Sequence, residues 1–386
     1  MSLVLLATSF GAFWITAVGL KAIAADVGGS RAVPSAASAL AWIGAGAGGI
    51  AMGQVAERYG IRWTVMVGAV SLCIGLFISS RGEPWQLYVG HGIFMGLLGV
   101  GGFNAPLYVY VSRWFDRRRG SALALISSGS YIAGFIWPPI FERAIATFGW
   151  RQTMVVYGIF AITVTLPLAL IFLRAAPEVP VVKSGGAAVV SPKVLGLNPN
   201  LAFGLISVAA FMCCVAMSMP QAHIVSLCSD LGISASHGAA MLSILLGTGF
   251  LSRQLWGVIS DRIGGLLTAL TSSALQAGAM TAFVFTQAEA GLFTVSAAFG
   301  IGFSALIPAY VLTIRELFPA SEASWRVPTL LFLSGSGMAT GGWLAGFLYD
   351  KFGYYAPAFA AGVGFNLVNL MLIAFLVSRQ KLITQT

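Results

Sequence analysis

Two positively charged side chains, Lys21 and Arg253, lie within long apolar stretches of the sequence. Ionisable groups in such stretches are costly to bury and tend to be functional. No aspartate or glutamate lies deep in these stretches, so neither cation has an obvious acidic partner. An anionic ligand could supply the missing charge, and the planar fork of arginine matches a carboxylate. Both residues are therefore candidates for anion binding.

Each cation also has a structural interpretation. Lys21 falls near the end of its apolar stretch, where a long side chain can reach the interface with water. Arg253 lies about two helical turns before the polar residues Asp261 and Arg262, with which it could form a network. Of the two cations, Arg253 is the stronger candidate for binding a substrate.

Several uncharged polar residues could assist. Asn104 and Tyr108 are one turn apart and share a helical face, with Pro106 between them. They could hydrogen-bond a carboxylate, or hold helices together. Tyr131, in a serine–glycine run, is a further candidate. His223 could titrate near neutral pH and couple transport to protons, or be hydrogen-bonded at the mouth of a channel.

The composition identifies the environment of these residues. The chain has 386 residues, of which 58% are hydrophobic and 9% charged, whereas soluble domains carry about 25% charged residues. This excludes disorder and argues against a soluble enzyme or a nucleic-acid-binding protein, despite the net charge of +9. The four cysteines lack metal-ligand spacing, and no nucleophile–base set or phosphate-binding motif is present. We expect an all-α integral membrane protein that is not an enzyme and has no metal or cofactor.

Apolar stretches of membrane-spanning length, about 20 residues, recur along the chain. We predict twelve transmembrane helices, near 3–25, 35–57, 63–80, 87–112, 120–142, 152–174, 200–227, 236–258, 266–286, 290–314, 327–349 and 354–378. A stretch rich in Pro, Gly and Ser, residues 175–199, divides them into two sets of six. The predicted domains are an N-terminal bundle (1–174), a cytoplasmic linker (175–199) and a C-terminal bundle (200–386).

The positions of the 21 Lys and Arg residues predict the orientation. Most of them fall on one side of the predicted membrane, the side that also holds both termini and the linker. Because cytoplasmic loops carry an excess of Lys and Arg, we expect both termini in the cytoplasm and the protein in the cell membrane. The first apolar stretch lacks a basic start and a cleavage site, so we interpret it as a retained membrane helix.

An internal repeat relates the two sets of helices. The strings GQVAERYGIR (53–62) and GVISDRIGG (257–265) share the pattern G-x-x-x-(D/E)-R-x-G at an offset of 204 residues, 257 against 53. The motif positions are Gly53, Glu57, Arg58 and Gly60, and Gly257, Asp261, Arg262 and Gly264. Phe148-Gly149-Trp150 and Phe352-Gly353-Tyr354 have the same offset. Parallel six-helix repeats with a site between them are typical of transporters whose halves rock.

This loop motif resembles the signature of the major facilitator superfamily, with Glu57 in place of the usual aspartate. Two strings resemble the monocarboxylate transporter family: GAFWITAVGLKAIAADV and HIVSLCSDLGISASHGAAMLSILLGTGFLSRQLWGVISDRIGG. The string VSRWFDRRRGSALALISSGS is similar to bacterial carriers that include the oxalate:formate antiporter branch. The resemblance covers essentially the whole chain and implies the major facilitator fold, with two pseudo-symmetric six-helix bundles.

The resemblance also implies site residues. A lysine of the first helix and an arginine of the eighth serve anion binding and proton coupling in that family, which implies these roles for Lys21 and Arg253. Gly249 stands where monocarboxylate transporters often have an aspartate, so coupling through an Asp–Arg pair is not expected. No lysine precedes Lys351 in the eleventh helix, which argues against a dianion antiporter.

We therefore expect a secondary active transporter for a small organic anion, with a monocarboxylate as the leading candidate, working by alternating access with or without a proton. The loop motifs would act as a cytoplasmic gate. The partners of the protein would be the anion, protons and the lipid bilayer, and we expect no nucleic acid among them. One chain could function as a monomer. The alternatives are a major facilitator exporter of drugs or other metabolites, and a non-transporting sensor built on a transporter scaffold.

Overall fold

The computed structural model describes residues 1–114, 125–174 and 193–384, which form helices and contain no strand. The first half contributes α1 (Ser2–Val18), α2 (Leu20–Asp26), α3 (Ala32–Tyr59), α4 (Ile61–Ser79), α5 (Pro84–Val89), the π-helix η1 (Gly90–Val100), α6 (Gly101–Trp114) and α8 (Gly129–Phe172). The second half contributes α9 (Pro199–Asp230), α10 (Ala235–Phe285), α11 (Glu289–Phe303), α12 (Leu306–Leu317), α13 (Ala320–Phe352) and α14 (Ala356–Thr384). Residues 175–192 of the predicted linker lie outside the described part.

Nine helices within the described ranges are long and apolar enough to cross a membrane. Two of them, 125–172 and 235–285, each contain two of the predicted segments. In each, one glycine with a non-helical backbone separates the two parts: Gly149 has a φ of 80° and Gly264 a φ of 79°. The predicted segment 327–349 lies in α13, which is not among the nine. The all-α fold is confirmed, whereas the count of twelve crossings stays a prediction.

The backbone repeats with the same offset as the sequence. Gly60 and Gly264 have φ values of 89° and 79°, and they are 204 residues apart (264 against 60). Gly149 and Gly353, with φ values of 80° and 81°, have the same separation (353 against 149). Glycine adopts positive φ at little cost, which explains why it occupies all four turns. The sequence repeat therefore coincides with a repeat of helix–turn geometry.

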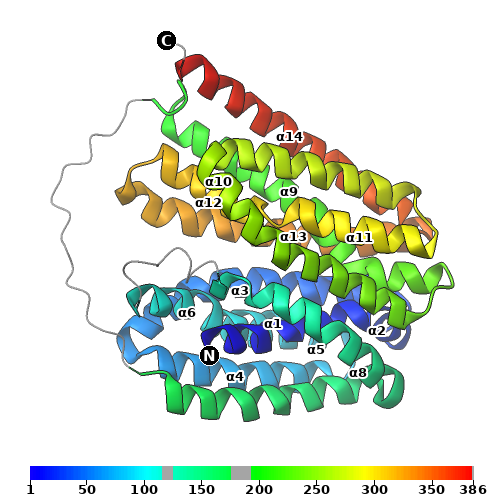
Figure 1. Ribbon diagram of the computed structural model, residues 1–386. Helices are drawn as coiled ribbons and strands as arrows, with labels where there is room; N and C mark the ends of the chain where they lie inside the picture. The colour runs from blue at the N-terminus through cyan, green and yellow to red at the C-terminus, as the bar shows by residue number, and fades with distance from the viewer. Residues whose placement is uncertain (115–124, 175–192, 385–386) are drawn as a thin grey trace.

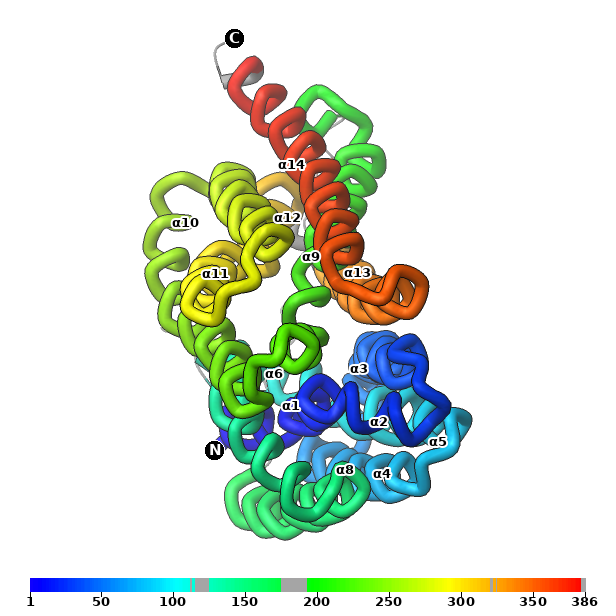
Figure 2. The backbone as a smooth tube through the Cα atoms, turned by 90° about the vertical axis from the view of Figure 1, so that its right-hand side faces the viewer, coloured from blue at the N-terminus to red at the C-terminus, as the bar shows by residue number. Residues whose placement is uncertain are grey.

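Two groups of helices lie side by side, α1 to α8 in one and α9 to α14 in the other (Figures 1 and 2). We call them the first lobe and the second lobe. Between them α3 packs against α13, and α8 packs against α10. The pair Gly60 and Gly264 relates α3 to the first part of α10, and the pair Gly149 and Gly353 relates the first part of α8 to α13. The α3–α13 contact and the α8–α10 contact are therefore equivalent under the repeat.

Within the first lobe, glycines allow very close helix packing. A Cβ atom on Gly48 of α3 would lie 1.9 Å from the carbonyl oxygen of Leu97 in η1. A Cβ on Gly44 would lie 2.3 Å from the carbonyl oxygen of Gly92. Only residues without a side chain permit these backbones to approach so closely. The glycine-rich strings of α3 and η1 thus hold the first lobe together.

Candidate functional site

Arg253 lies where the two lobes meet, on the part of α10 that faces α8. Its guanidinium carbon is 5.0 Å from the centroid of the Tyr131 ring, a cation–π arrangement. The Tyr131 hydroxyl also interacts with this guanidinium, and the Tyr108 hydroxyl lies within reach of its charge. The structure thus brings together three predicted site residues that belong to three different helices, α6, α8 and α10.

Neighbouring contacts fix the position of the Arg253 backbone. Ser252 Oγ lies 2.8 Å from Ser304 Oγ, and Trp256 Nε1 donates to the carbonyl oxygen of Ile301 at 2.9 Å. These bonds join α10 to the end of α11 on both sides of Arg253. No carboxylate in the described part of the chain forms an ion pair with Arg253. Arg253 is therefore a half-buried cation at the junction of the lobes, without an ion-pair partner among the residues that the structure describes.

Asn104 belongs to α6, one turn before Tyr108, and is partly buried. It makes no hydrogen bond with any residue that the structure describes. Its amide thus has free donors and acceptors, but no recorded contact joins it to Arg253.

Lys21 does not join this group. Its Nζ atom lies 3.0 Å from Asp230 Oδ1, and its side chain is 53% exposed. The expectation that Lys21 lacks an acidic partner is wrong, because α9 continues beyond the predicted segment 200–227 and ends at Asp230. The recorded contacts of Lys21 do not include Arg253, so the structure gives the two cations different surroundings.

Asp230 also binds Arg31, at the start of α3. The two guanidinium nitrogens of Arg31 donate to the two carboxylate oxygens at 2.6 and 2.7 Å. The Arg31 guanidinium lies 3.6 Å from the ring centroid of Tyr349 and donates to the Tyr355 hydroxyl at 2.7 Å. Burial alone would lower the pKa of Arg31, but its hydrogen bonds to Asp230 and Tyr355 outweigh this and raise it. Such a bidentate, partly buried pair is strong.

A second carboxylate joins the lobes at the same end. Asp350, near the end of α13, accepts hydrogen bonds from Ser30 Oγ at 2.7 Å and from the backbone nitrogens of Arg31 and Ala32, both at 2.9 Å. It therefore satisfies the free N–H groups at the N-terminus of α3, where negative charge is favourable. We call Lys21, Arg31, Asp230 and Asp350 the Asp230 lock.

Sequence reasoning missed Arg31, Asp230 and Asp350 as a group. Each lies at the end of a predicted segment, where a charge is expected at the interface with water. The sequence does show acidic and basic residues at the ends of these segments. Their positions along the chain do not indicate which segment ends meet in the fold.

His223 lies beside the Asp230 lock. Its Nε2 is 2.8 Å from the carbonyl oxygen of Gly342, so this nitrogen carries the hydrogen. Its Nδ1 lies 3.0 Å from the Tyr355 hydroxyl and accepts from it. The imidazole is fully buried and connects α9 to α13. The geometry agrees with the expectation of a hydrogen-bonded histidine.

The repeated loop motif lies at the ends of α3 and of the first part of α10. Glu57 Oε1 is 3.7 Å from Arg113 Nη2, an exposed pair within the first lobe. The Arg58 guanidinium lies 5.4 Å from the ring centroid of Tyr59. Asp261 and Arg262 are exposed and have no ion-pair partner among the described side chains.

The motif glycines divide into two kinds. Gly60 and Gly264 form turns with positive φ, whereas Gly53 and Gly257 face open space, with no atom within 4 Å of an added Cβ.

The ion pairs that join the lobes all belong to the Asp230 lock, and the described residues at the motif end add none. The lobes are thus ion-paired at one end of the molecule.

The described residues contain no group of three or more His, Cys, Asp or Glu side chains that could hold a metal ion.

Comparison with known proteins agrees with the repeat and the fold. The sequence profile of the Major Facilitator Superfamily matches residues 2–324. The chain belongs to the Major Facilitator Superfamily. The resemblance predicted from the loop motif is thus confirmed, and the chain is related to transporters.

Relatives of this chain include Monocarboxylate transporter 13 of Bos taurus. The two sequences are 24% identical over 318 residues, which cover 82% of this chain and 73% of the relative. MFS-type transporter pynF of Aspergillus niger is 24% identical over 323 residues, covering 81% of this chain and 73% of the relative. The monocarboxylate transporter resemblance is thus confirmed at low identity.

Solved structures of transporters have a fold similar to that of this chain. The nucleoside transporter NupG, as a D323A mutant, aligns with a TM-score of 0.73 at 13% identity and covers 97% of this chain and 99% of its own. A bacterial homolog of the human lysosomal transporter Spinster aligns with a TM-score of 0.67 at 16% identity, covering 98% and 95%. Family and apolar helices together indicate a multi-pass membrane protein.

Proposed function

We propose that this chain is a secondary active transporter that moves a small organic anion, specifically a monocarboxylate, by alternating access. The observation that carries the proposal is Arg253, a guanidinium held between the lobes on the Tyr131 ring and without an ion-pair partner among the described side chains. A cation at membrane depth without an acidic partner favours an anionic ligand. Kinship to Monocarboxylate transporter 13 supports the same substrate class.

The chemistry of binding follows from the three side chains. The guanidinium fork would donate to both oxygens of a carboxylate, which gives charge as well as direction. The hydroxyls of Tyr108 and Tyr131 would donate to the same oxygens from the first lobe. A bound carboxylate would therefore bridge the lobes, and its binding would favour a state in which they are closed around it.

The Asp230 lock supplies the second element of alternating access. It joins the lobes at the end of the molecule that holds α2, whereas α6 and the loop motif lie toward the other end (Figure 1). The distribution of Lys and Arg favours a cytoplasmic location for the motif end. In this orientation, with both termini inside and the lobes formed by 1–174 and 200–386, the lock closes the outer end. Rocking would break it when the transporter opens outward.

His223 is the candidate for proton coupling. Its Nδ1 accepts from Tyr355, whose oxygen in turn accepts from Arg31. A proton on Nδ1 would remove this acceptor and place a positive charge beside Arg31, with Asp350 as the nearby opposing charge. Protonation would therefore loosen the Asp230 lock and favour outward opening.

Ligand binding by the purified, full-length protein tests the anion site. Melting temperatures are measured in detergent against a panel of organic acids, with hydrophobic cations as a competing class, for the wild type and Arg253→Ala. The matched control is Arg143→Ala, an exposed arginine at the far end of the first part of α8. We expect stabilisation by monocarboxylates that is lost in Arg253→Ala and kept in the control. Stabilisation by cations alone would instead favour an exporter of drugs or other metabolites.

A further inference from the structure

The π-helix η1 leads directly into α6, the helix that carries the site residues Asn104 and Tyr108. Hydrogen bonds in a π-helix run to the fifth residue along the chain instead of the fourth, so its turns are wider than those of an α-helix. Most π-helices are single turns within α-helices, often at functional sites, whereas η1 extends over 11 residues. A segment of this length needs contacts that keep it in this form.

Glycines permit the wide turns and their close packing. A Cβ atom on Gly99 would lie 2.9 Å from the carbonyl oxygen of Phe94, five residues earlier in η1 itself. A Cβ atom on Gly75 of α4 would lie 2.5 Å from the carbonyl oxygen of Gly90, the first residue of η1. Larger residues at these positions would crowd η1 or push α4 away from it.

His91 joins η1 to two other helices. Its imidazole is fully buried. Nε2 lies 2.9 Å from Oγ1 of Thr16 in α1, and Nδ1 lies 2.8 Å from Oγ of Ser79, the last residue of α4. Nδ1 is also 3.2 Å from the carbonyl oxygen of Leu87 in α5, just before η1. These contacts fix how the start of η1 is rotated relative to α1 and α4.

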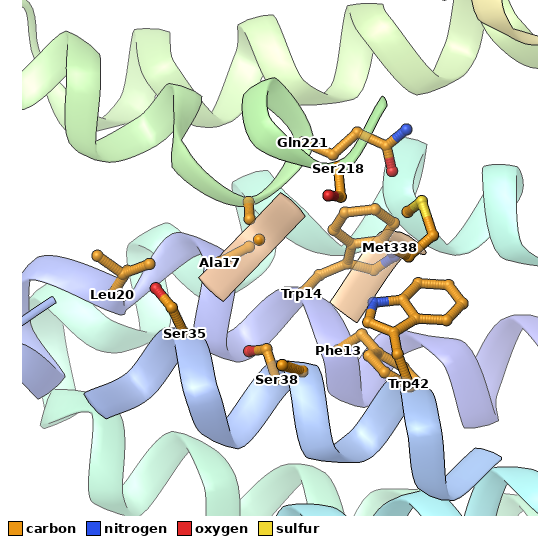
Figure 3. Close-up of a pocket in the computed structure, with 13 residues that line it drawn as sticks. Phe13, Trp14, Ala17, Leu20, Ser35, Ser38, Trp42, Ser218, Gln221 and Met338 are labelled. Carbon is orange, nitrogen blue, oxygen red and sulfur yellow. The ribbon is translucent and has the colours of Figure 1, made fainter. Parts of the chain in front are cut away.

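Helix α1, to which His91 binds, also packs against α9 of the second lobe. Phe13, Trp14 and Ala17 of α1 line a small cavity between the lobes, together with Ser218 and Gln221 of α9 (Figure 3). The contact between His91 and α1 therefore ties η1 to a helix that faces the second lobe.

The geometry of η1 determines which face of α6 is turned toward the second lobe. Successive residues of an α-helix are rotated by about 100° about its axis, since 3.6 residues make one turn. The wider turns of a π-helix rotate each residue by less, and the difference accumulates over the 11 residues of η1. Tyr108 lies within reach of the Arg253 charge in this arrangement. An α-helical η1 that started from the same His91 contacts would turn Tyr108 in another direction.

We propose that His91 is a positioning residue for the anion site, because it holds η1 in the π-helical form that directs the Tyr108 hydroxyl toward Arg253. The inference rests on the proposed function, in which Tyr108 donates to the bound carboxylate. His91 acts on the anion through Tyr108 and not by contact.

A double-mutant cycle tests whether His91 acts through Tyr108. Dissociation constants of pyruvate are measured by calorimetry on the full-length protein in detergent, for the wild type, both single variants and the double variant. Tyr108→Phe removes one donor to a charged ligand and should weaken binding about ten-fold. His91→Leu should weaken binding by up to the same factor. In the Tyr108→Phe background it should add less than about two-fold, because residues that act as one unit are not additive.

A matched variant separates positioning from stability. Tyr157→Phe removes another buried hydrogen bond of the first lobe, from the Tyr157 hydroxyl to the carbonyl oxygen of Thr8 at 2.6 Å. It should lower the melting temperature, as His91→Leu does, and leave the affinity for pyruvate unchanged. Should His91→Leu fail to fold, Ser79→Ala takes its place in the cycle, with the same lack of additivity expected.

The results distinguish failure of the positioning role from failure of the anion site. Independent, multiplying losses in the two single variants would overturn the role of His91 and leave the anion site standing. Wild-type affinity in a folded His91→Leu protein, or in Tyr108→Phe, would do the same. Pyruvate binding that persists in Arg253→Ala would overturn the proposed function, and this inference with it.

Discussion

The ring of Tyr131 occupies the space beside Gly249: a Cβ atom on Gly249 would lie 3.0 Å from Cε1 of that ring. The ring stacks on Phe303 at a centroid distance of 5.7 Å and supports the Arg253 guanidinium from the other lobe. Gly249 stands where monocarboxylate transporters often have an aspartate. In this chain a neutral ring from the opposite lobe therefore takes the place of an acidic partner, and the guanidinium stays free for a ligand.

This contact predicts how an aspartate at position 249 would change stability and uptake. Gly249→Asp should displace the Tyr131 ring, lower the melting temperature and reduce uptake. The double variant Gly249→Asp/Tyr131→Ala should recover stability, because the carboxylate then has room beside Arg253. We expect a coupling free energy of about 0.5–3 kcal/mol, the range for residues in contact. Strictly additive effects on the free energy of unfolding would show that the two positions do not share this space.

A disulfide tests the Asp230 lock. Ser30 Oγ and Asp350 Oδ2 are 2.7 Å apart across the lobes, so Ser30→Cys/Asp350→Cys brings two thiols close together. Oxidation should trap the lobes and stop uptake into proteoliposomes, and a reducing agent should restore it. Ser30→Cys alone, treated identically, controls for oxidation of the native cysteines. Uptake that continues in the fully cross-linked protein would mean that this end does not open during transport.

Helix packing in the first lobe predicts different stabilities for two glycine-to-alanine variants of α3. Gly48→Ala should destabilise the protein by about 1–3 kcal/mol, because the new methyl group meets the Leu97 carbonyl and forces the backbones apart. Gly53→Ala, in the same helix, meets no atom within 4 Å and should be neutral, or more stable by up to about 1 kcal/mol. Equal melting temperatures for the two variants in detergent would contradict this account.

Much of the architecture could be predicted because it depends on local sequence. The apolar stretches predicted the helices, and the offset of the loop motifs predicted the repeat that Gly60 and Gly264 share in their backbone. The grouping of Arg253 with Tyr131 was not predictable, although both were candidates. It depends on how α8 crosses α10, which no spacing along the chain reports.

The ends of helices were the weakest part of the prediction. Extending α9 by three residues beyond 227 gives Lys21 the acidic partner that the sequence did not suggest. Gly149 and Gly264, by contrast, interrupt α8 and α10 close to where loops were expected, each with a non-helical backbone. A chain in an apolar environment favours keeping its backbone hydrogen bonds within a helix, so α9 runs further than hydropathy indicates.

Uptake of a labelled monocarboxylate into proteoliposomes is the most direct test of the anion site. Wild type, Arg253→Ala and the control Arg143→Ala are reconstituted at equal density, with folding checked by melting temperature. We expect uptake by Arg253→Ala to fall to the background of empty liposomes, a loss of at least about 100-fold for removal of a charged, bidentate contact. The control should retain uptake. Wild-type rates from a well-folded Arg253→Ala protein would show that Arg253 does not bind the transported anion.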